Sequence, residues 1–212
     1  MVRERAKINT KCWNVLISAD VNSLLTNSLQ EHLQTIRKLL ESSLADIERS
    51  GRLICDALTG GRKILICGNG GSAADAQHIA AELIGYYESP RKSWPAIALT
   101  TDTSALTAVS NDLGFEHVFA RQVAGLAQAG DVLIAISTSG KSKNVLRALE
   151  QARESGCKTI LLTGGLLTGE SNETLDSLCD VVVAVPATRT ARIQEAHITI
   201  GHLWCEMVDQ FS

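Results

Sequence analysis

The sequence lacks any apolar run that approaches the length of a membrane-spanning helix, so we expect no membrane segment. It also lacks the apolar core of a signal peptide. The first twenty residues carry early charges and then Asn, Lys and Asp where such a core would lie. We therefore expect a cytoplasmic protein that does not act at a membrane.

An excess of one sign of charge is missing as well. The 20 Lys and Arg residues and the 23 Asp and Glu residues give a formal net charge of −3, and the two signs are interspersed. No broad basic surface is expected for nucleic acid. A small anion would have to be bound locally, by loops.

Cysteines in CxxC spacing are absent, so neither a structural zinc site nor a redox couple is indicated. The six cysteines are scattered, at Cys12, Cys55, Cys67, Cys157, Cys179 and Cys205. Several lie in apolar runs, where a reduced and buried thiol is expected. This agrees with a reducing compartment.

The length of 212 residues, with 45% hydrophobic residues, suits one domain with a helical extension. Apolar residues recur at three- and four-residue spacing from about Val21 to Leu58, which predicts an amphipathic helix. We assign residues 1–60 to an N-terminal helical arm for packing or oligomerisation, and residues 61–212 to the main domain.

From Gly61 onward, short apolar runs alternate with helical segments. The runs are nearly continuous in Val, Ile, Leu and Ala, as in parallel strands that are covered on both faces. They are Ile64–Cys67, Ala96–Thr100, Val132–Ser137, Thr159–Thr163 and Val181–Val185. The expected helices are Ser72–Tyr87, Ser104–Ser110, Phe115–Ala127, Ser142–Ser155 and Ala191–Phe211. This alternation predicts an α/β fold, a doubly wound three-layer sandwich with a mainly parallel five-stranded sheet.

The stretch Gly68–Glu82 joins the first predicted strand to a helix through a glycine-rich turn. The helix start at Ser72 presents backbone N–H groups that attract anions. Further along, His78 and Glu82 stand four residues apart and project from one face. One segment thus offers a phosphate cradle and an acid/base pair.

A second turn, Ile136–Ser142, leads from the third predicted strand into another helix and contains three serines and a threonine. A single Ser/Gly turn of this kind is more often a helix N-cap. Ligands of doubly wound folds bind beyond the carboxyl ends of the strands, where both turns fall. Together with Ser72, the second turn therefore predicts a cup for a monophosphate.

Two nucleotide-binding patterns are matched only in part. Gly68–Ala73 satisfies the loose GxGxxG/A pattern, but the acid at a suitable distance, Glu88, lies past the end of a helix and not at a strand tip. Gly140–Ser142 looks like the end of a P-loop, but the glycine needed five positions earlier is Ala135. We expect no nucleotide cofactor.

The last predicted helix contains Gln194, His197 and His202. At about 100° per residue, His197 lies about 60° to one side of Gln194 and His202 about 80° to the other. Only one of the two can easily join Gln194 at a shared point. A histidine on an otherwise apolar helix is more often a core or interface residue, and the spacing does not choose between them.

These motifs, in this order, resemble those of the phosphoheptose isomerases in the sugar isomerase (SIS) domain family. The resemblance covers about Gly61 to the C-terminus and is carried by Cys67–Leu83, Asn111–Asp112, Ile136–Ser142 and Arg192–His202. It implies the SIS fold and a homotetramer. It also implies conversion of sedoheptulose 7-phosphate to D-glycero-D-manno-heptose 7-phosphate, the first step of heptose synthesis for lipopolysaccharide and capsule.

The resemblance also implies roles for single residues. Serine hydroxyls would hold the phosphate, with a threonine close by: Ser72, Ser137, Ser139 and Ser142, with Thr138. The sugar would be contacted by Asn69, Asp112 and Gln194. Glu82 would be the base and His202 the partner acid. Some members bind zinc at the positions that match His78, Glu82, Gln194 and His202, so zinc is an implied cofactor.

Three positions depart from the family pattern. Tyr86 stands where Arg is frequent, Lys141 where Asn is more usual, and Ala191 where some members carry an acidic residue. The first departure puts one substrate contact in doubt, and Lys141 would add positive charge near the phosphate. The third removes any catalytic role for that position.

The residue types suit aldose–ketose isomerisation, in which a proton leaves the carbon beside the carbonyl and returns to the neighbouring carbon. Glu82 would shuttle this proton through an enediol while His202 moves protons between the oxygens. A carboxylate cannot easily be a free base and a tight zinc ligand at once, so metal-free and zinc-assisted schemes are alternatives.

Two other functions stay open. The first is a non-catalytic SIS tetramer that binds the replication initiator, because Thr188–Gln194 is similar to a segment of such a factor. Glu82 and His202 favour the enzyme, since a binding protein needs no acid/base pair. The second is an isomerase of the same mechanism for another phosphorylated sugar, such as a pentose phosphate.

Overall fold

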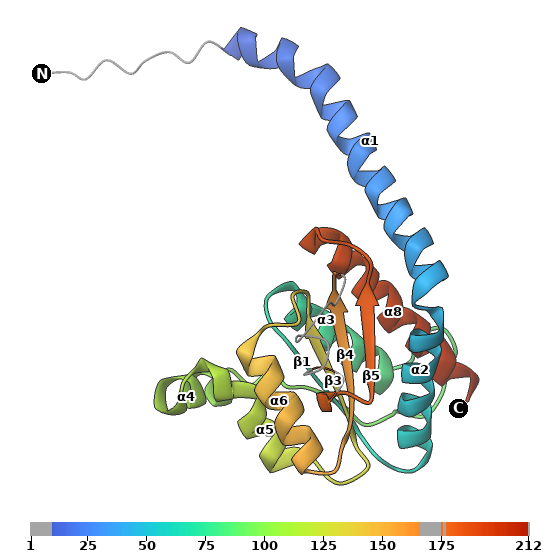
Figure 1. Ribbon diagram of the computed structural model, residues 1–212, viewed down its shortest axis with the longest axis vertical. Helices are drawn as coiled ribbons and strands as arrows, with labels where there is room; N and C mark the ends of the chain where they lie inside the picture. Colours follow the sequence, from blue (N-terminus) through green and yellow to red (C-terminus); the bar gives the residue numbers. More distant parts are fainter. Residues whose placement is uncertain (1–9, 166–174, 176, 212) are drawn as a thin grey trace, which may run out of the picture. The chain divides into compact units, whose positions relative to one another are not determined.

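The computed structural model describes residues 10–165, 175 and 177–211, with side chains from residue 20 onward. By its internal contacts the chain divides into two units, residues 1–34 and 35–212. The described residues of the first unit, 10–34, are helical and form the first part of α1 (Thr10–Ser42), drawn in blue in Figure 1. Several leucines of this part are exposed: Leu24, Leu25, Leu29 and Leu33.

The single helix predicted over Val21–Leu58 is interrupted at Ser43. α1 ends at Ser42, and α2 (Leu44–Thr59) follows. The Ser43 hydroxyl donates a hydrogen bond to the carbonyl of Ala184 at 3.1 Å. Helical backbone hydrogen bonds continue on both sides of the break, so the apolar periodicity does not reveal it.

Five parallel strands form the sheet of the second unit, which confirms the predicted α/β class. They are β1 (Ile64–Gly68), β2 (Ala96–Ala98), β3 (Val132–Ser137), β4 (Lys158–Gly164) and β5 (Val181–Val185), in the order β2-β1-β3-β4-β5. β1 pairs with β2 on one side and with β3 on the other. The winding direction therefore reverses between β1 and β3, and doubly wound sheets bind ligands at such a point.

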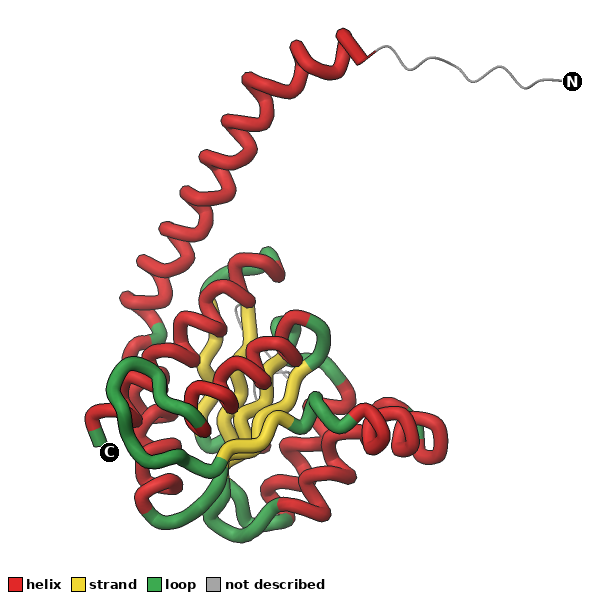
Figure 2. Tube along the Cα trace, turned by 180° about the vertical axis from the view of Figure 1, so that it is seen from behind, coloured by secondary structure: helices red, strands yellow, loops and turns green. Residues whose placement is uncertain are grey.

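Helices cover both faces of the sheet, which gives the predicted three layers (Figure 2). One face packs against α2, α3 (Gly71–Ile84) and α8 (Thr190–Gln210). The other packs against α5 (Val118–Leu126) and α6 (Lys143–Glu154). α4 (Thr103–Leu113) and the 3₁₀ turn Phe115–His117 precede α5.

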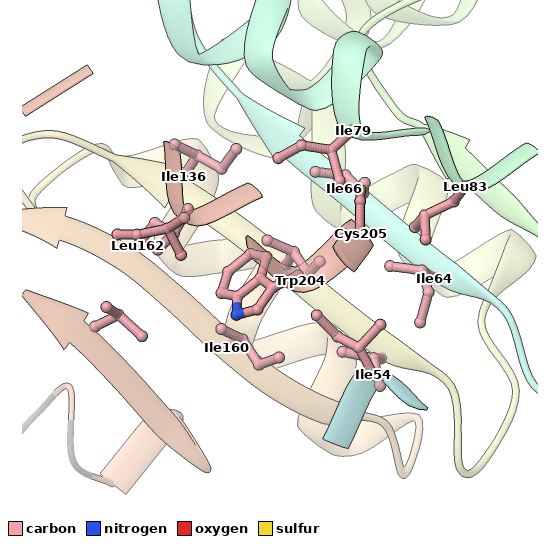
Figure 3. Packing of buried hydrophobic residues seen from close by; sticks show 14 of the residues in the cluster. Ile54, Ile64, Ile66, Ile79, Leu83, Ile136, Ile160, Leu162, Trp204 and Cys205 are labelled. Atoms are coloured by element: carbon pink, nitrogen blue, oxygen red, sulfur yellow. The ribbon is translucent and has the colours of Figure 1, made fainter. Parts of the chain in front are cut away.

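Each face of the sheet has its own hydrophobic core. Successive side chains along a strand point to opposite faces and so enter different cores. Ile64 and Ile66 of β1 pack with α2, α3 and α8, whereas Leu65 and Cys67 pack with α5 and α6. Trp204 of α8 lies in the first core (Figure 3), and its indole N–H donates to the Ile47 carbonyl at 3.2 Å and to the Ser50 hydroxyl at 3.0 Å. Because this buried polar group is satisfied, Trp204 fixes α8 against α2.

The cysteines with described side chains are buried and form no disulfide bond within the described part of the chain: Cys55, Cys67, Cys157, Cys179 and Cys205. The side chain of Cys12 lies outside the described residues. Burial raises the pKa of the Cys67 and Cys205 thiols to about 12. Within the part of the chain that the structure describes, none of the helices has the length and apolar character needed to cross a membrane.

Candidate active site

A tight glycine turn places the start of α3 at the carboxyl edge of the sheet. Gly70 has a φ of 58°, a conformation that favours glycine. A Cβ on Gly68 would lie 2.8 Å from the Cβ of Ser72, so only glycine lets the end of β1 pass this close to the helix. Ser72 is buried in the first turn of α3.

The serine loop after β3 gathers its hydroxyl groups beside the start of α6. Ser137 donates from Oγ to Oγ of Ser142 at 3.0 Å, and Oγ of Ser139 accepts from the backbone N–H of Lys141 at 3.2 Å. The Thr138 carbonyl accepts from the N–H of Gly164 at 3.2 Å, which ties the loop to β4. Ser142 is the N-cap residue of α6, yet among the described residues its hydroxyl does not cap the helix.

The two loops are joined by a pair of asparagines. Asn69 donates from Nδ2 to Oδ1 of Asn144 at 2.9 Å, and Asn144 donates back to Oδ1 of Asn69 at 2.8 Å. Asn144 lies in the first turn of α6 and is buried. Asn144 was not among the residues expected from the sequence, although its place two residues after Ser142, at a helix start on the same sheet edge, was a usable signal.

Of the residues implied to contact the sugar, Gln194 lies against the start of α3. A Cβ on Gly71 would lie 2.9 Å from Cδ of Gln194, so a larger residue there would displace the Gln194 amide. Asp112 lies exposed at the end of α4 and accepts a hydrogen bond from Nδ2 of Asn111 at 2.8 Å. The hydrogen bonds of the described residues do not join Asp112 to the serine loop.

His78, Glu82 and His202 form a second cluster on α3 and α8. Nε2 of His78 lies 3.2 Å from Oε1 of Glu82 and 3.3 Å from Nε2 of His202. The helices run parallel, since Gly71 lies against Gln194 and Ile79 against Gly201. This packing brings His202 beside His78.

The structure also distinguishes the two histidines of α8. His197 is buried in the core, where its Nε2 lies 3.1 Å from the carbonyl oxygen of Thr163. Burial lowers the pKa of His197 to about 4 and outweighs this hydrogen bond, which acts in the opposite direction. His197 is therefore a core residue, and His202 is the histidine of α8 that lies in the cluster with His78 and Glu82.

Tyr87 adds an aromatic wall to this cluster. Its ring stacks on the imidazole of His202, with centroids 5.3 Å apart and an angle of 28° between the planes. Its neighbour Tyr86 is exposed. Tyr87 was not among the residues expected from the sequence, although its place three residues after the end of α3, the helix that carries Glu82, was a usable signal.

The donors of the second cluster suit zinc in kind: two imidazoles, a carboxylate and the nearby amide of Gln194. Ligands of a tetrahedral zinc ion with bonds of ~2.0–2.1 Å lie about 3.3–3.4 Å apart. The separations of 3.3 Å for His78–His202 and 3.2 Å for His78–Glu82 are close to this value. However, no three His, Cys, Asp or Glu residues of the described chain are placed to hold one ion together. A side-chain rotation would be needed to complete the set.

The comparisons with known proteins agree on one family. A family model for the SIS domain matches residues 29–164. The phosphoheptose isomerase of Nitratiruptor sp. is 55% identical over 88% of this chain and 97% of its own length, and that of Aliarcobacter butzleri is 49% identical over 89% and 97%.

Two solved structures are also similar over most of the chain. The phosphoheptose isomerase from Neisseria gonorrhoeae has a TM-score of 0.81 and 42% identity, and the match covers 90% of this chain and 99% of that one. The phosphoheptose isomerase from Francisella tularensis has a TM-score of 0.84 and 35% identity, with 90% and 98% covered.

Proposed function

Because the chain belongs to the SIS domain family and, within it, to the phosphoheptose isomerases, we propose that it converts sedoheptulose 7-phosphate to D-glycero-D-manno-heptose 7-phosphate. Its nature as a sugar phosphate isomerase follows from relatives at 55% and 49% identity over most of the chain. The single observation that carries the proposal is that α3 begins beside a hydroxyl-rich loop and carries Glu82 near its other end, where His78 contacts both Glu82 and His202.

The phosphate binds at the carboxyl edge of the sheet in this proposal. The N-termini of α3 and α6 both attract an anion, and the hydroxyls of Ser72, Ser137, Ser139 and Ser142 donate to its oxygens. The reciprocal bonds of Asn69 and Asn144 support this role because they hold the two loops together.

The reacting carbons lie toward Glu82. Ser72 and Glu82 are ten residues apart on α3, about 15 Å along the helix axis. An extended sugar phosphate would thus place its phosphate at the helix start and its carbonyl end near the acid/base cluster. Remote binding of the phosphate orients the substrate for the chemical step.

Glu82 acts as the base of an enediol mechanism. It removes the proton from C1 of the ketose, next to the C2 carbonyl, and returns a proton to C2 to form the aldose. His202 donates a proton to the C2 oxygen and takes the proton from the C1 hydroxyl. Asn69, Asp112 and Gln194 bind sugar hydroxyls, and Thr138 supports the phosphate loop.

Zinc binding by His78, Glu82, Gln194 and His202 is part of the proposal as an alternative to the metal-free scheme. A bound zinc ion would polarise the substrate carbonyl. The donor types and the two separations of the cluster support it.

We further propose a cytoplasmic homotetramer whose product enters lipopolysaccharide or capsule heptose. Residues 61–212 would form the isomerase domain and residues 1–60 the arm for packing and oligomerisation. The exposed leucines of α1 support a role in assembly, since exposed apolar patches mark interaction surfaces. The non-catalytic, initiator-binding alternative gains no support from the comparisons.

The test is to incubate the purified protein with sedoheptulose 7-phosphate and to detect the aldose by NMR. We expect conversion by the wild type and a loss of about 10²–10⁴-fold in kcat for Glu82→Gln with substrate binding retained. No conversion by the wild type, with or without added zinc, would overturn the proposed reaction. Near wild-type turnover by Glu82→Gln would overturn the role of Glu82 alone.

A further inference from the structure

The guanidinium of Arg91 closes the C-terminal end of α3. Its Nη2 donates to the carbonyl of Glu82 at 2.9 Å, and its Nη1 donates to the carbonyls of Leu83 at 2.9 Å and of Gly85 at 3.3 Å. Carbonyls at a helix end lack partners within the helix, and a cation there complements the helix dipole. The Arg91 side chain is only 4% exposed, and its bonds to the carbonyls of Glu82 and Leu83 are part-buried.

Asp209 of α8 holds Arg91 from the other side. Nε of Arg91 donates to Oδ1 of Asp209 at 2.7 Å, and Oδ2 accepts from the backbone N–H groups of Glu88 at 2.9 Å and Ser89 at 3.1 Å. Burial alone would raise the pKa of the Asp209 carboxyl, but these hydrogen bonds and the charge of Arg91 lower it overall. The contacts of Asp209 therefore favour its charged carboxylate form.

This ion pair connects to both halves of the acid/base cluster. Arg91 binds the backbone of Glu82 directly. Asp209 lies seven residues, about two turns, after His202 and so on the same face of α8. Asp209 also fixes the loop that follows Tyr87, whose ring stacks on His202.

We propose that Arg91 and Asp209 are positioning residues of the isomerisation: their ion pair sets the distance between the Glu82 carboxylate and the His202 imidazole, which belong to different helices. This inference rests on the proposed function of Glu82 and His202. Neither Arg91 nor Asp209 touches the reacting atoms. A displacement of about 1 Å in a catalytic group can cost about 10²-fold in rate, so a clamp of this kind matters for turnover.

A matched control is available in a second buried ion pair. Nζ of Lys63 lies 2.5 Å from Oδ2 of Asp131, with side chains 19% and 1% exposed. Asp131 also accepts from the backbone N–H groups of Lys63 and Gln128, so this pair joins β1 to the turn before β3. Its loss tests what the removal of a buried charge partner does to stability alone.

The experiment compares Arg91→Met, Arg91→Lys and Asp209→Asn with Lys63→Met, by kcat and KM for sedoheptulose 7-phosphate and by melting temperature. We expect Arg91→Met and Asp209→Asn to lower kcat about 10- to 100-fold, with KM changed less than about threefold because the phosphate contacts remain. Arg91→Lys keeps the positive charge but loses the planar guanidinium group with its several donors. We expect its kcat to lie between that of these two variants and that of the wild type. Lys63→Met should lower the melting temperature and leave kcat within about twofold.

Two results would overturn the inference. One is wild-type kcat in Asp209→Asn and Arg91→Lys, which also decides the matter should Arg91→Met fail to fold. The other is a fall in kcat of Lys63→Met that matches its fall in melting temperature in the same way as in the Arg91 and Asp209 variants. Lost stability alone would then explain the lost activity of those variants. An inactive wild type would instead overturn the proposed function. In that case the imidazole NMR signals of His202 still test the clamp, since they should shift in Arg91→Lys and not in Lys63→Met.

Discussion

The side-chain amides of Asn69 and Asn144 exchange two hydrogen bonds, of 2.9 and 2.8 Å, between the loops that follow β1 and β3. These two strands flank the point where the winding direction of the sheet reverses. The pair thus holds the starts of α3 and α6 beside each other. Any ligand shared by the two loops depends on this connection.

Replacing Asn144 with Ala should therefore weaken phosphate binding more than the chemical step. The change leaves the amide of Asn69 without its partner, which costs about 1–3 kcal/mol of stability and loosens both loops. We expect a clear rise in KM for sedoheptulose 7-phosphate, with a smaller fall in kcat. Asn144→Asp should raise KM further, since it places a negative charge at the helix start where we propose that the phosphate binds. An unchanged KM in both variants, and unchanged calorimetric affinity for inorganic phosphate, would contradict this.

Zinc should bind to the cluster of α3 and α8 rather than elsewhere on the chain. We expect calorimetry to detect one zinc ion per chain in the wild type and much weaker binding in His78→Ala and His202→Ala. Cobalt substitution offers a readout that does not depend on activity, because a tetrahedral cobalt site absorbs strongly in the visible range. Unchanged activity after exhaustive chelation would favour the metal-free scheme. Zinc affinity that survives both substitutions would place the metal elsewhere.

The buried His197 should make folding stability depend on pH. Its pKa is about 4 in the folded chain and 6.5 when unperturbed, because burial disfavours the charged form. Above pH ~6.5 the imidazole is neutral in both the folded and the unfolded state, so His197 does not make the folding stability depend on pH there. As the pH falls toward ~4, the unfolded state takes up a proton that the folded state does not, and stability falls by roughly 3 kcal/mol.

The measurement is urea unfolding of the wild type and of His197→Gln between pH 4 and 8. Asp75 has the opposite effect, since burial raises the pKa of its carboxyl to about 6. Only the difference between the two proteins therefore reports His197. We expect this difference to shrink or reverse as the pH falls, and a difference that stays constant over the range would show that His197 does not titrate as described.

Much of the fold follows from local sequence signals. The run Ile64–Cys67 predicts a strand that differs from β1 by one residue, because a parallel strand covered on both faces needs a continuous apolar run. β3 and β5 have the predicted ends. The break at Ser43 could not be foreseen, because it leaves the helical periodicity intact. The hydroxyl of Ser43 bonds there to the carbonyl of Ala184, 141 residues away.

The parts of the site that could not be foreseen depend on contacts between distant residues. Asn69 and Asn144 are 75 residues apart, and Arg91 and Asp209 are 118 residues apart. No spacing rule relates residues at such separations. The family resemblance pointed to His202, whereas the helical angle alone did not distinguish it from His197. The packing of α3 against α8 brings His202 beside His78 and leaves His197 in the core.

Gly201 allows α8 to pack closely against α3, and we expect its replacement to lower activity as well as stability. A Cβ on Gly201 would lie 2.8 Å from Cδ1 and Cγ1 of Ile79, which is closer than carbon atoms approach without a shift. Gly201→Ala should therefore push α8 away from α3, lower stability by about 1–3 kcal/mol and separate His202 from His78.

The control is Gly125→Ala on α5, where an added Cβ meets nothing within 4 Å. This substitution should raise stability by about 0.5–1 kcal/mol, because alanine is the better helix former, and leave turnover unchanged. Melting curves and kcat for both variants, measured below their melting temperatures, separate the two effects. If Gly201→Ala loses stability but keeps wild-type kcat, then the close approach of the two helices stabilises the fold without setting the geometry of the acid/base cluster. A loss of kcat in Gly201→Ala and not in Gly125→Ala links the smallest residue of α8 to the placement of His202.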